Sequence, residues 1–115
     1  MNVKNVRDAL LSVTDNVYHY KANPECKDRY IVWGETRADA TFNADDNTDI
    51  MAIAGEIYYY TTVEYDEIFD DICTALSDNN IAWSLSSIGY DDELGQIVYA
   101  LIWEVACGNG KIYRQ

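Results

Sequence analysis

Residues 81–105 constrain the fold more than any other stretch, because their pattern predicts a β-hairpin with one unusually apolar arm. Residues 81–86 alternate between large apolar and small side chains, which is typical of a half-buried strand. Residues 91–95 are mostly acidic and end in a glycine, as a hairpin turn requires. Residues 97–105 are apolar on both faces, so this arm needs cover on both sides. A chain of 115 residues has little material to provide that cover.

Length and composition predict a single domain over residues 1–115. A chain of this length can form one two-layer core, and an apolar content of 49% argues against disorder. No apolar run is long enough for a membrane span, and no basic-then-apolar leader precedes the first helix. We therefore expect no membrane association and no export. The odd number and wide spacing of the cysteines favour reduced thiols over a disulfide; they are Cys26, Cys73 and Cys107.

Hydrophobic periodicity predicts two helices and several strands. Val3, Val6 and Leu10 recur at helical spacing after Asn2, which can cap the first helix. The expected elements are a helix over 3–13, strands over 17–20, 30–35 and 50–62, a helix over 65–76, and the hairpin over 81–105. This order predicts an α+β fold, with an antiparallel (mixed) sheet of about four to five strands and two α-helices packed on one face.

Two segments lack this periodicity. Residues 36–49 are polar and turn-prone, so we expect a long acidic loop or an irregular hairpin tip there. Residues 106–115 contain two glycines and predict a flexible tail, or one ordered only by a partner.

The start of the second helix has more than one interpretation. Thr61 and Glu64 have capping-box spacing, although Tyr65 or Asp66 could equally be the first residue. The acidic residues around this start are interpreted as a solvated stripe rather than an acid/base or metal site; they are Glu64, Asp66, Glu67, Asp70 and Asp71.

Charge is divided unevenly along the chain, whose net charge is −12. All eight Lys and Arg residues lie within residues 1–37 or after residue 110, while residues 38–110 carry fifteen acids and no base. An acidic field repels phosphates, which argues against a DNA- or RNA-reading module. The division of charge could simply favour solubility. It would also suit head-to-tail assembly, in which the basic part of one copy meets the acidic part of another.

If both helices cover one face of the sheet, the other face stays apolar and open. Such a patch usually marks a partner surface, so we expect the protein to oligomerise. The predicted subunit-interface residues are Tyr58, Tyr60, Val98, Ala100 and Ile102.

No arrangement of residues predicts catalysis, a cofactor or a metal centre. Asp45, Asn47, Asp49 and Glu56 match four positions of a calcium loop, but Ile50 replaces its glycine, so chance is favoured and only weak surface binding of cations stays open. His19 is the only histidine, for which a structural role is favoured. No nucleophile–base pair, phosphate loop or dinucleotide motif appears, and we expect a protein that is not an enzyme.

Three stretches resemble one family of virion proteins: YIVWGE at 30–35, IYYYTTVEYDEIFDDICTAL at 57–76 and IAWSLSSIGYDDELGQIVYALIWEV at 81–105. The sequence resembles the small tail terminator, or tail completion, proteins of long non-contractile-tailed bacteriophages and prophages of Gram-positive bacteria, often labelled minor tail or minor capsid proteins. The resemblance covers most of the chain after residue 29. It departs from the family at Glu67, where many relatives have a helix-starting proline.

The resemblance implies a non-enzymatic protein of the virion tail or neck, assembled in the host bacterial cytoplasm. It would form a ring, commonly a hexamer, that ends tail-tube polymerisation, and its partners would be the tail tube protein and the head connector protein. DNA would pass through the ring without specific binding, which acidic walls suit. From the residue pattern, the loop is a candidate for channel lining or docking through Asp39, Asp45, Asp46 and Asp49.

Two other functions stay open. A head-tail connector adaptor or stopper is also small, acidic and ring-forming. An acidic binding or inhibitor module that mimics DNA would use the same excess of negative charge without forming a ring.

Overall fold

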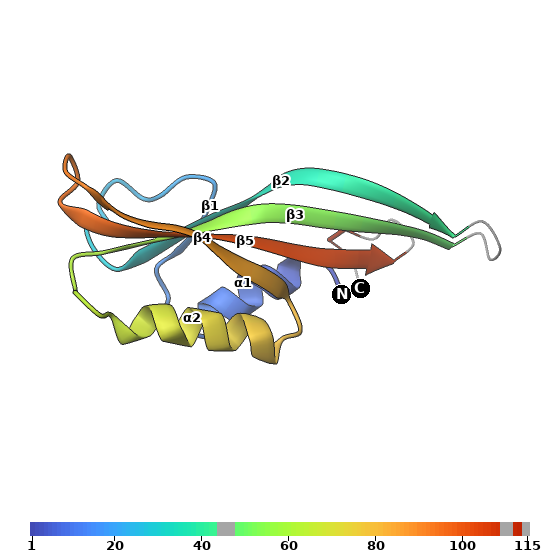
Figure 1. The fold of residues 1–115 in the computed structure, drawn as a ribbon, viewed down its shortest axis with the longest axis horizontal. Helices are drawn as coiled ribbons and strands as arrows, with labels where there is room; N and C mark the ends of the chain where they lie inside the picture. The colour runs from blue at the N-terminus through green and yellow to red at the C-terminus, as the bar shows by residue number, and fades with distance from the viewer. Residues whose placement is uncertain (44–47, 109–111, 114–115) are drawn as a thin grey trace.

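The computed structural model describes residues 1–43, 48–108 and 112–113, and it has a curved sheet with both helices on one side (Figure 1). The elements are α1 (Lys4–Leu11), β1 (Val17–His19), β2 (Tyr30–Asn43), β3 (Thr48–Thr61), α2 (Glu67–Asp78), β4 (Ala82–Asp91) and β5 (Gln96–Gly108). The strand order is β1-β2-β3-β5-β4, in which β1 is parallel to β2 and the other neighbours are antiparallel. The predicted α+β class, the mixed sheet and the helices on one face are confirmed.

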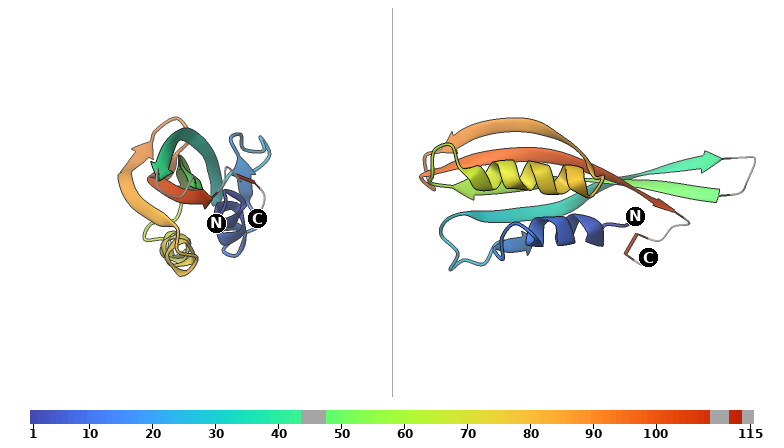
Figure 2. Two further views of the ribbon diagram at one scale, coloured as in Figure 1. Left: turned by 90° about the vertical axis from the view of Figure 1, so that its right-hand side faces the viewer. Right: turned by 90° about the horizontal axis from the view of Figure 1, so that it is seen from below.

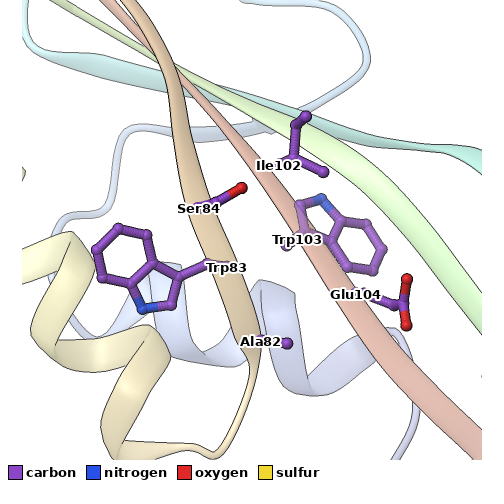
Figure 3. A pocket seen from close by; sticks show the side chains of 6 residues that line it. All are labelled: Ala82, Trp83, Ser84, Ile102, Trp103 and Glu104. Carbon is purple, nitrogen blue, oxygen red and sulfur yellow. The ribbon is translucent and has the colours of Figure 1, made fainter.

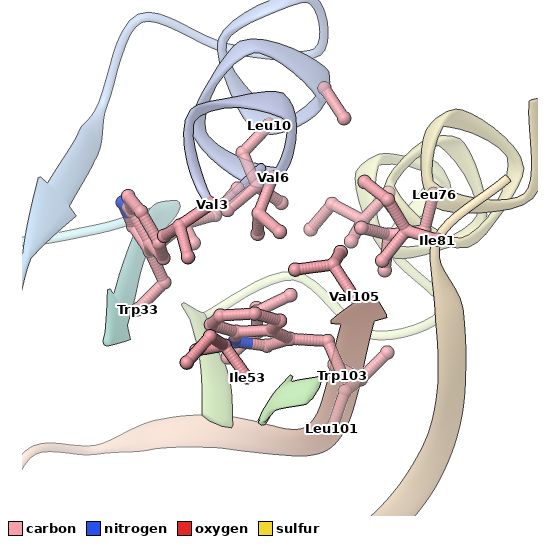
Figure 4. Packing of buried hydrophobic residues seen from close by; sticks show 14 of the residues in the cluster. Val3, Val6, Leu10, Trp33, Ile53, Leu76, Ile81, Leu101, Trp103 and Val105 are labelled. Atoms are coloured by element: carbon pink, nitrogen blue, oxygen red, sulfur yellow. The ribbon is translucent and has the colours of Figure 1, made fainter. Parts of the chain in front are cut away.

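The hydrophobic core lies between the sheet and the two helices. Val6 and Leu10 of α1 and Ile72 and Leu76 of α2 are fully buried, as their helical spacing predicts. Figure 4 shows both helices presenting apolar side chains to Trp103 of β5. Burial of each aliphatic side chain stabilises the fold by about 1.5–3 kcal/mol, so this layer supplies most of the driving force for folding.

Trp103 packs against the sheet because the residue opposite it on β3 is a glycine. Trp103 pairs with Gly55 in the β3–β5 register, and a Cβ at Gly55 would overlap both the indole ring and the carbonyl oxygen of Gly34. The indole Nε1 donates a hydrogen bond to the carbonyl oxygen of Glu56, 3.3 Å away. The glycine therefore marks a close approach between the ring and the backbone.

The predicted long loop over 36–49 is wrong for the described residues, because β2 and β3 continue through most of it as a long arm, beside which β5 pairs with β3 as far as Ile50. The alternative of a hairpin agrees with the antiparallel pairing of the two strands. The ladder runs from the bulge between Glu35 and Arg37 out to the pair of Asn43 with Thr48. Figure 2 shows the arm extending past the ends of both helices, in a molecule that measures 52 × 24 × 23 Å. The strand pairing with β3 forms this part of β2, so its sequence need not alternate.

The predicted flexible tail over 106–115 is also wrong for the residues that the structure describes. Residues 106–108 belong to β5, and Cys107 is fully buried. The backbone N–H of Val3 donates to the carbonyl oxygen of Ile112, 2.8 Å away, and Ile112 packs against the core. The rest of the expected tail, 109–111 and 114–115, lies outside the described residues.

The helix α2 begins at Glu67, one residue after its cap, so the capping box of Thr61 and Glu64 is wrong. Asp66 is the N-cap, and its side chain accepts a hydrogen bond from the backbone N–H of Ile68, 2.9 Å away. Thr61 instead donates its hydroxyl to Asp66, 2.7 Å away. A strand end and a helix start therefore share one carboxylate, which capping-box spacing alone cannot predict.

Candidate assembly surface

The sheet face away from the helices brings the five predicted interface residues together on β3 and β5. Tyr60 pairs with Val98, Tyr58 with Ala100, and Ile102 with Glu56. The residues between them in each strand lie on the opposite face, and they include the fully buried Ile57, Tyr59 and Leu101. The predicted grouping is therefore present in the fold, and its role in subunit contact stays a prediction.

These five residues differ in how far neighbouring side chains already shield them. Ile102 is 41% exposed, whereas the other four are half-buried. Tyr60 stacks on Tyr30, with ring centroids 4.7 Å apart, and the hydroxyl of Tyr58 donates to the carboxylate of Glu56. Ile102 is thus the most accessible apolar point of this face.

Three hollows follow one another across this face and share lining residues. The first, of about 110 Å³, and the second, of about 190 Å³, share Glu56 and Tyr58. The second and the third, of about 250 Å³, share Ile102. Small residues create these hollows, notably Gly34 in the first, Ala100 in the second, and Ala82 and Ser84 in the third. The face therefore has shallow, open depressions that side chains of a partner can enter.

The edge strand β4 exposes three large apolar side chains, of which only Leu85 lies in the stretch that the sequence pattern assigned to a half-buried strand. Leu85 is 43% exposed, Ile88 57% and Tyr90 64%, because α2 reaches only the start of the strand. There the indole Nε1 of Trp83 donates to the hydroxyl of Ser77, 2.9 Å away. The strand carries no charge from 82 to 90, and an uncharged edge is prone to pair with another chain. This surface was missed because a sequence pattern does not say which strand lies at an edge.

The four acidic residues predicted for channel lining do not form one described site. Asp39 is in β2, opposite Ala52, and Asp49 is in β3, opposite Phe42. Asp45 and Asp46 lie outside the described residues, so their place in an assembly stays a prediction. The calcium-loop match also gains no support, because Glu56 lies in mid-strand and bonds Tyr58.

Asp66 is not part of a solvated stripe, because its side chain is fully buried. The other four acids of the predicted stripe are exposed: Glu64, Glu67, Asp70 and Asp71. Burial alone raises the pKa of the Asp66 carboxyl, but hydrogen bonds from Arg29, Thr61, Tyr59 and the Ile68 N–H outweigh burial and lower that pKa. Asp66 is therefore an ionised structural centre at the start of α2, with no free position for a ligand.

His19 also has a structural contact, which joins β1 to the neighbouring strand β2. Its Nε2 lies 2.9 Å from Oε1 of Glu35, and the hydroxyl of Tyr20 donates to Oε2 of Glu35, 2.6 Å away. This hydrogen bond to a carboxylate is the main cause of the raised pKa of Tyr20. The tyrosine ring covers Gly34, where a Cβ would overlap it. The favoured structural role of His19 agrees with these contacts.

The remaining chemistry of the described residues is sparse. No group of three His, Cys, Asp or Glu residues among them is placed to hold a metal ion, and all three cysteines are free. Burial raises the pKa of the Cys73 and Cys107 thiols, which disfavours the reactive thiolate. Within the described part of the chain, no helix is long and apolar enough to cross a bilayer.

Comparison with known proteins does not add a family to this geometry. No protein-family model matches the chain, and no curated protein matches it significantly.

Proposed function

We propose that this protein is a structural component of a phage tail, a terminator that forms a ring at the end of the tail tube. The observation that carries the proposal is the hollowed apolar face of β3 and β5, which neither helix covers. Ile102, at 41% exposure, lines two of its three hollows. Both helices of the described residues lie on the other face, so a second copy can cover this one. A heterologous contact of that kind forms a closed ring when the rotation between neighbours closes.

The arm of β2 and β3 supports the same proposal. It extends past the helices, so it can contact a neighbour or the tube without disturbing the core. Between residues 38 and 110 the chain has fifteen acids and no base, so surfaces built from this region would repel the phosphates of passing DNA. The resemblance of residues 30–35, 57–76 and 81–105 to tail terminator proteins gives these features a common role.

Deletion of the gene from its phage or prophage tests the proposal. Electron microscopy should show abnormally long tails, and the gene supplied in trans should restore their normal length. Tails of normal length that are separated from heads would instead identify a head-tail connector, which could use the same face and arm. Normal, infectious particles would contradict both roles.

A further inference from the structure

The largest of the three hollows is shallow and open, and its lining combines apolar and small side chains with one acid. It lies between β4 and β5, has a volume of about 250 Å³, and is lined by Ala82, Trp83, Ser84, Ile102, Trp103 and Glu104. Ala82 pairs with Glu104 and Ser84 with Ile102, so two short side chains face two longer ones. Figure 3 shows these four side chains on one side of the strands, while Trp83 points away toward α2.

Among the described residues, Glu104 is the only charged one that lines this hollow. Its carboxylate is exposed and makes no hydrogen bond or ion pair with another described residue. Arg37 faces the same side of the sheet, but Ala54 separates it from Glu104 in the row of paired residues. A hollow of this kind suits a long aliphatic side chain with a cationic end, whose stem would pack on Ile102 while its charge meets Glu104.

The two helices differ in how well they could fill such a hollow in a second copy. The exposed residues of α2 include Glu67, Asp70, Asp71 and Asp78 and no base, so α2 would be repelled by Glu104. The outer side of α1 carries Lys4 and Arg7. Nε and Nη2 of Arg7 both bind Oδ1 of Asp8, at 3.0 and 2.9 Å, which leaves Lys4 as the source of net positive charge.

Leu11, seven residues after Lys4 and so on the same side of α1, is 43% exposed, and Met1, which precedes the helix, is 51% exposed. The Arg7–Asp8 ion pair lies between Lys4 and Leu11, so the outer side of α1 is mainly charged, with Lys4 as the cation that no described residue pairs. The hollow has one acid beside Ile102, so the two surfaces are complementary in charge.

We infer that Lys4 on α1 of one copy docks into the hollow at Glu104 of the next copy. The inference rests on the proposed ring, and it names the contact that would build it. Because α1 and the hollow lie on opposite faces of the sheet, each copy offers α1 to one neighbour and the hollow to the other. Such a head-to-tail contact repeats around a ring and covers Ile102.

Charge reversal in the full-length protein tests the contact by sedimentation equilibrium at rising protein concentration. Lys4→Glu and Glu104→Lys should each weaken self-association by about tenfold or more. The double variant should restore association to within about threefold of the wild type, because the pair is rebuilt in reverse. Glu104→Lys also makes the chain less negative, which on general repulsion alone would strengthen association, so a weakening identifies the specific contact.

Lys21→Glu is the matched control, since it makes the same charge change at an exposed lysine between β1 and β2. It should leave the association constant unchanged. The inference is overturned if Lys21→Glu weakens association as much as Lys4→Glu, if the double variant fails to recover, or if the wild type is a monomer at every concentration. Should Glu104→Lys lower the melting temperature, Glu104→Gln removes the charge without adding length and gives the same test.

The tail-length experiment separates this inference from the proposed function. A phage that carries Glu104→Lys and still makes tails of normal length would overturn the contact alone, provided that the deletion phage makes long tails. Normal tails in the deletion phage would overturn the terminator role itself.

Discussion

The guanidinium of Arg29 makes a bidentate pair with the carboxylate of Asp66, which lies 37 residues later in the sequence. Nη2 lies 2.9 Å from Oδ1, and Nε lies 3.2 Å from Oδ2. The same carboxylate accepts the hydroxyls of Tyr59 and Thr61, each 2.7 Å away, and the backbone N–H of Ile68. One side chain thus joins the residue before β2, the end of β3 and the start of α2. The bidentate pair fixes how the helix meets the sheet.

Replacing Asp66 by Asn should lower the free energy of unfolding by about 3 kcal/mol. The amide cannot accept every donor that now meets the carboxylate, and it leaves buried hydroxyl groups without full partners. Urea denaturation at pH 7 measures the change. Asp70→Asn, an exposed change in the same helix, is the control and should stay within about 0.5 kcal/mol of the wild type. Equal losses in the two variants would contradict a special role for Asp66.

The same carboxylate should make stability depend on acid. The pKa of Asp66 is lower in the folded protein than its unfolded value of about 3.9, so its contribution is complete above that pH and is lost as the pH falls toward the folded-state pKa. The stability difference between the wild type and Asp66→Asn should therefore shrink steadily below about pH 4. Denaturation curves at pH 7, 4, 3 and 2 test this, and a constant difference would exclude it.

Gly55→Ala should destabilise the fold by about 1–3 kcal/mol, because the new methyl group has to displace the Trp103 ring and the Gly34 carbonyl. Thermal unfolding followed by circular dichroism measures the stability, and tryptophan fluorescence reports the surroundings of the Trp103 ring. Gly89→Ala is the control, since nothing lies within 4 Å of its added Cβ. A neutral Gly55→Ala would mean that the ring has room to move.

Ile102→Asp should weaken subunit association while it costs less than about 1 kcal/mol of stability, because 41% of this side chain is already exposed. Sedimentation measures the subunit association, and urea denaturation measures the free energy of unfolding. An unfolded variant would show instead that both faces of β5 serve the core of one copy.

Ile88→Lys should suppress aggregation on warming without lowering the melting temperature. Ile88 is 57% exposed on the uncharged edge strand β4, and a lysine there opposes pairing with another chain. Light scattering during a temperature ramp is the measurement. Unchanged scattering would place the aggregation-prone segment elsewhere.

The sequence was most informative where burial repeats at a fixed period. Val6, Leu10, Ile72 and Leu76 revealed both helices and their buried sides, and the alternation around Tyr58 and Ala100 revealed a second apolar face. The grouping of the predicted interface residues followed from this period, because strand residues two apart share a face.

The sequence was least informative where long-range pairing decides the structure. The arm from Glu35 to Asn43 is held by its ladder with β3, so it shows no hydrophobic period. Asp66 was assigned to solvent because helical position alone ignores Arg29, which comes from 37 residues away. Ile88 was not recognised as exposed, since strand order, and with it the sheet edge, is a property of the whole fold.

The arm has a mechanical consequence. Its strands are the outer halves of β2 and β3, and β3 is paired on both sides from Ile50 to Tyr60, with β2 and with β5. A pull along the arm would therefore load these hydrogen bonds in shear, so that many pairs share the force instead of opening one after another. The arm therefore resists being pulled away from the rest of its domain. A flexible loop would instead straighten first and transmit little of the applied force.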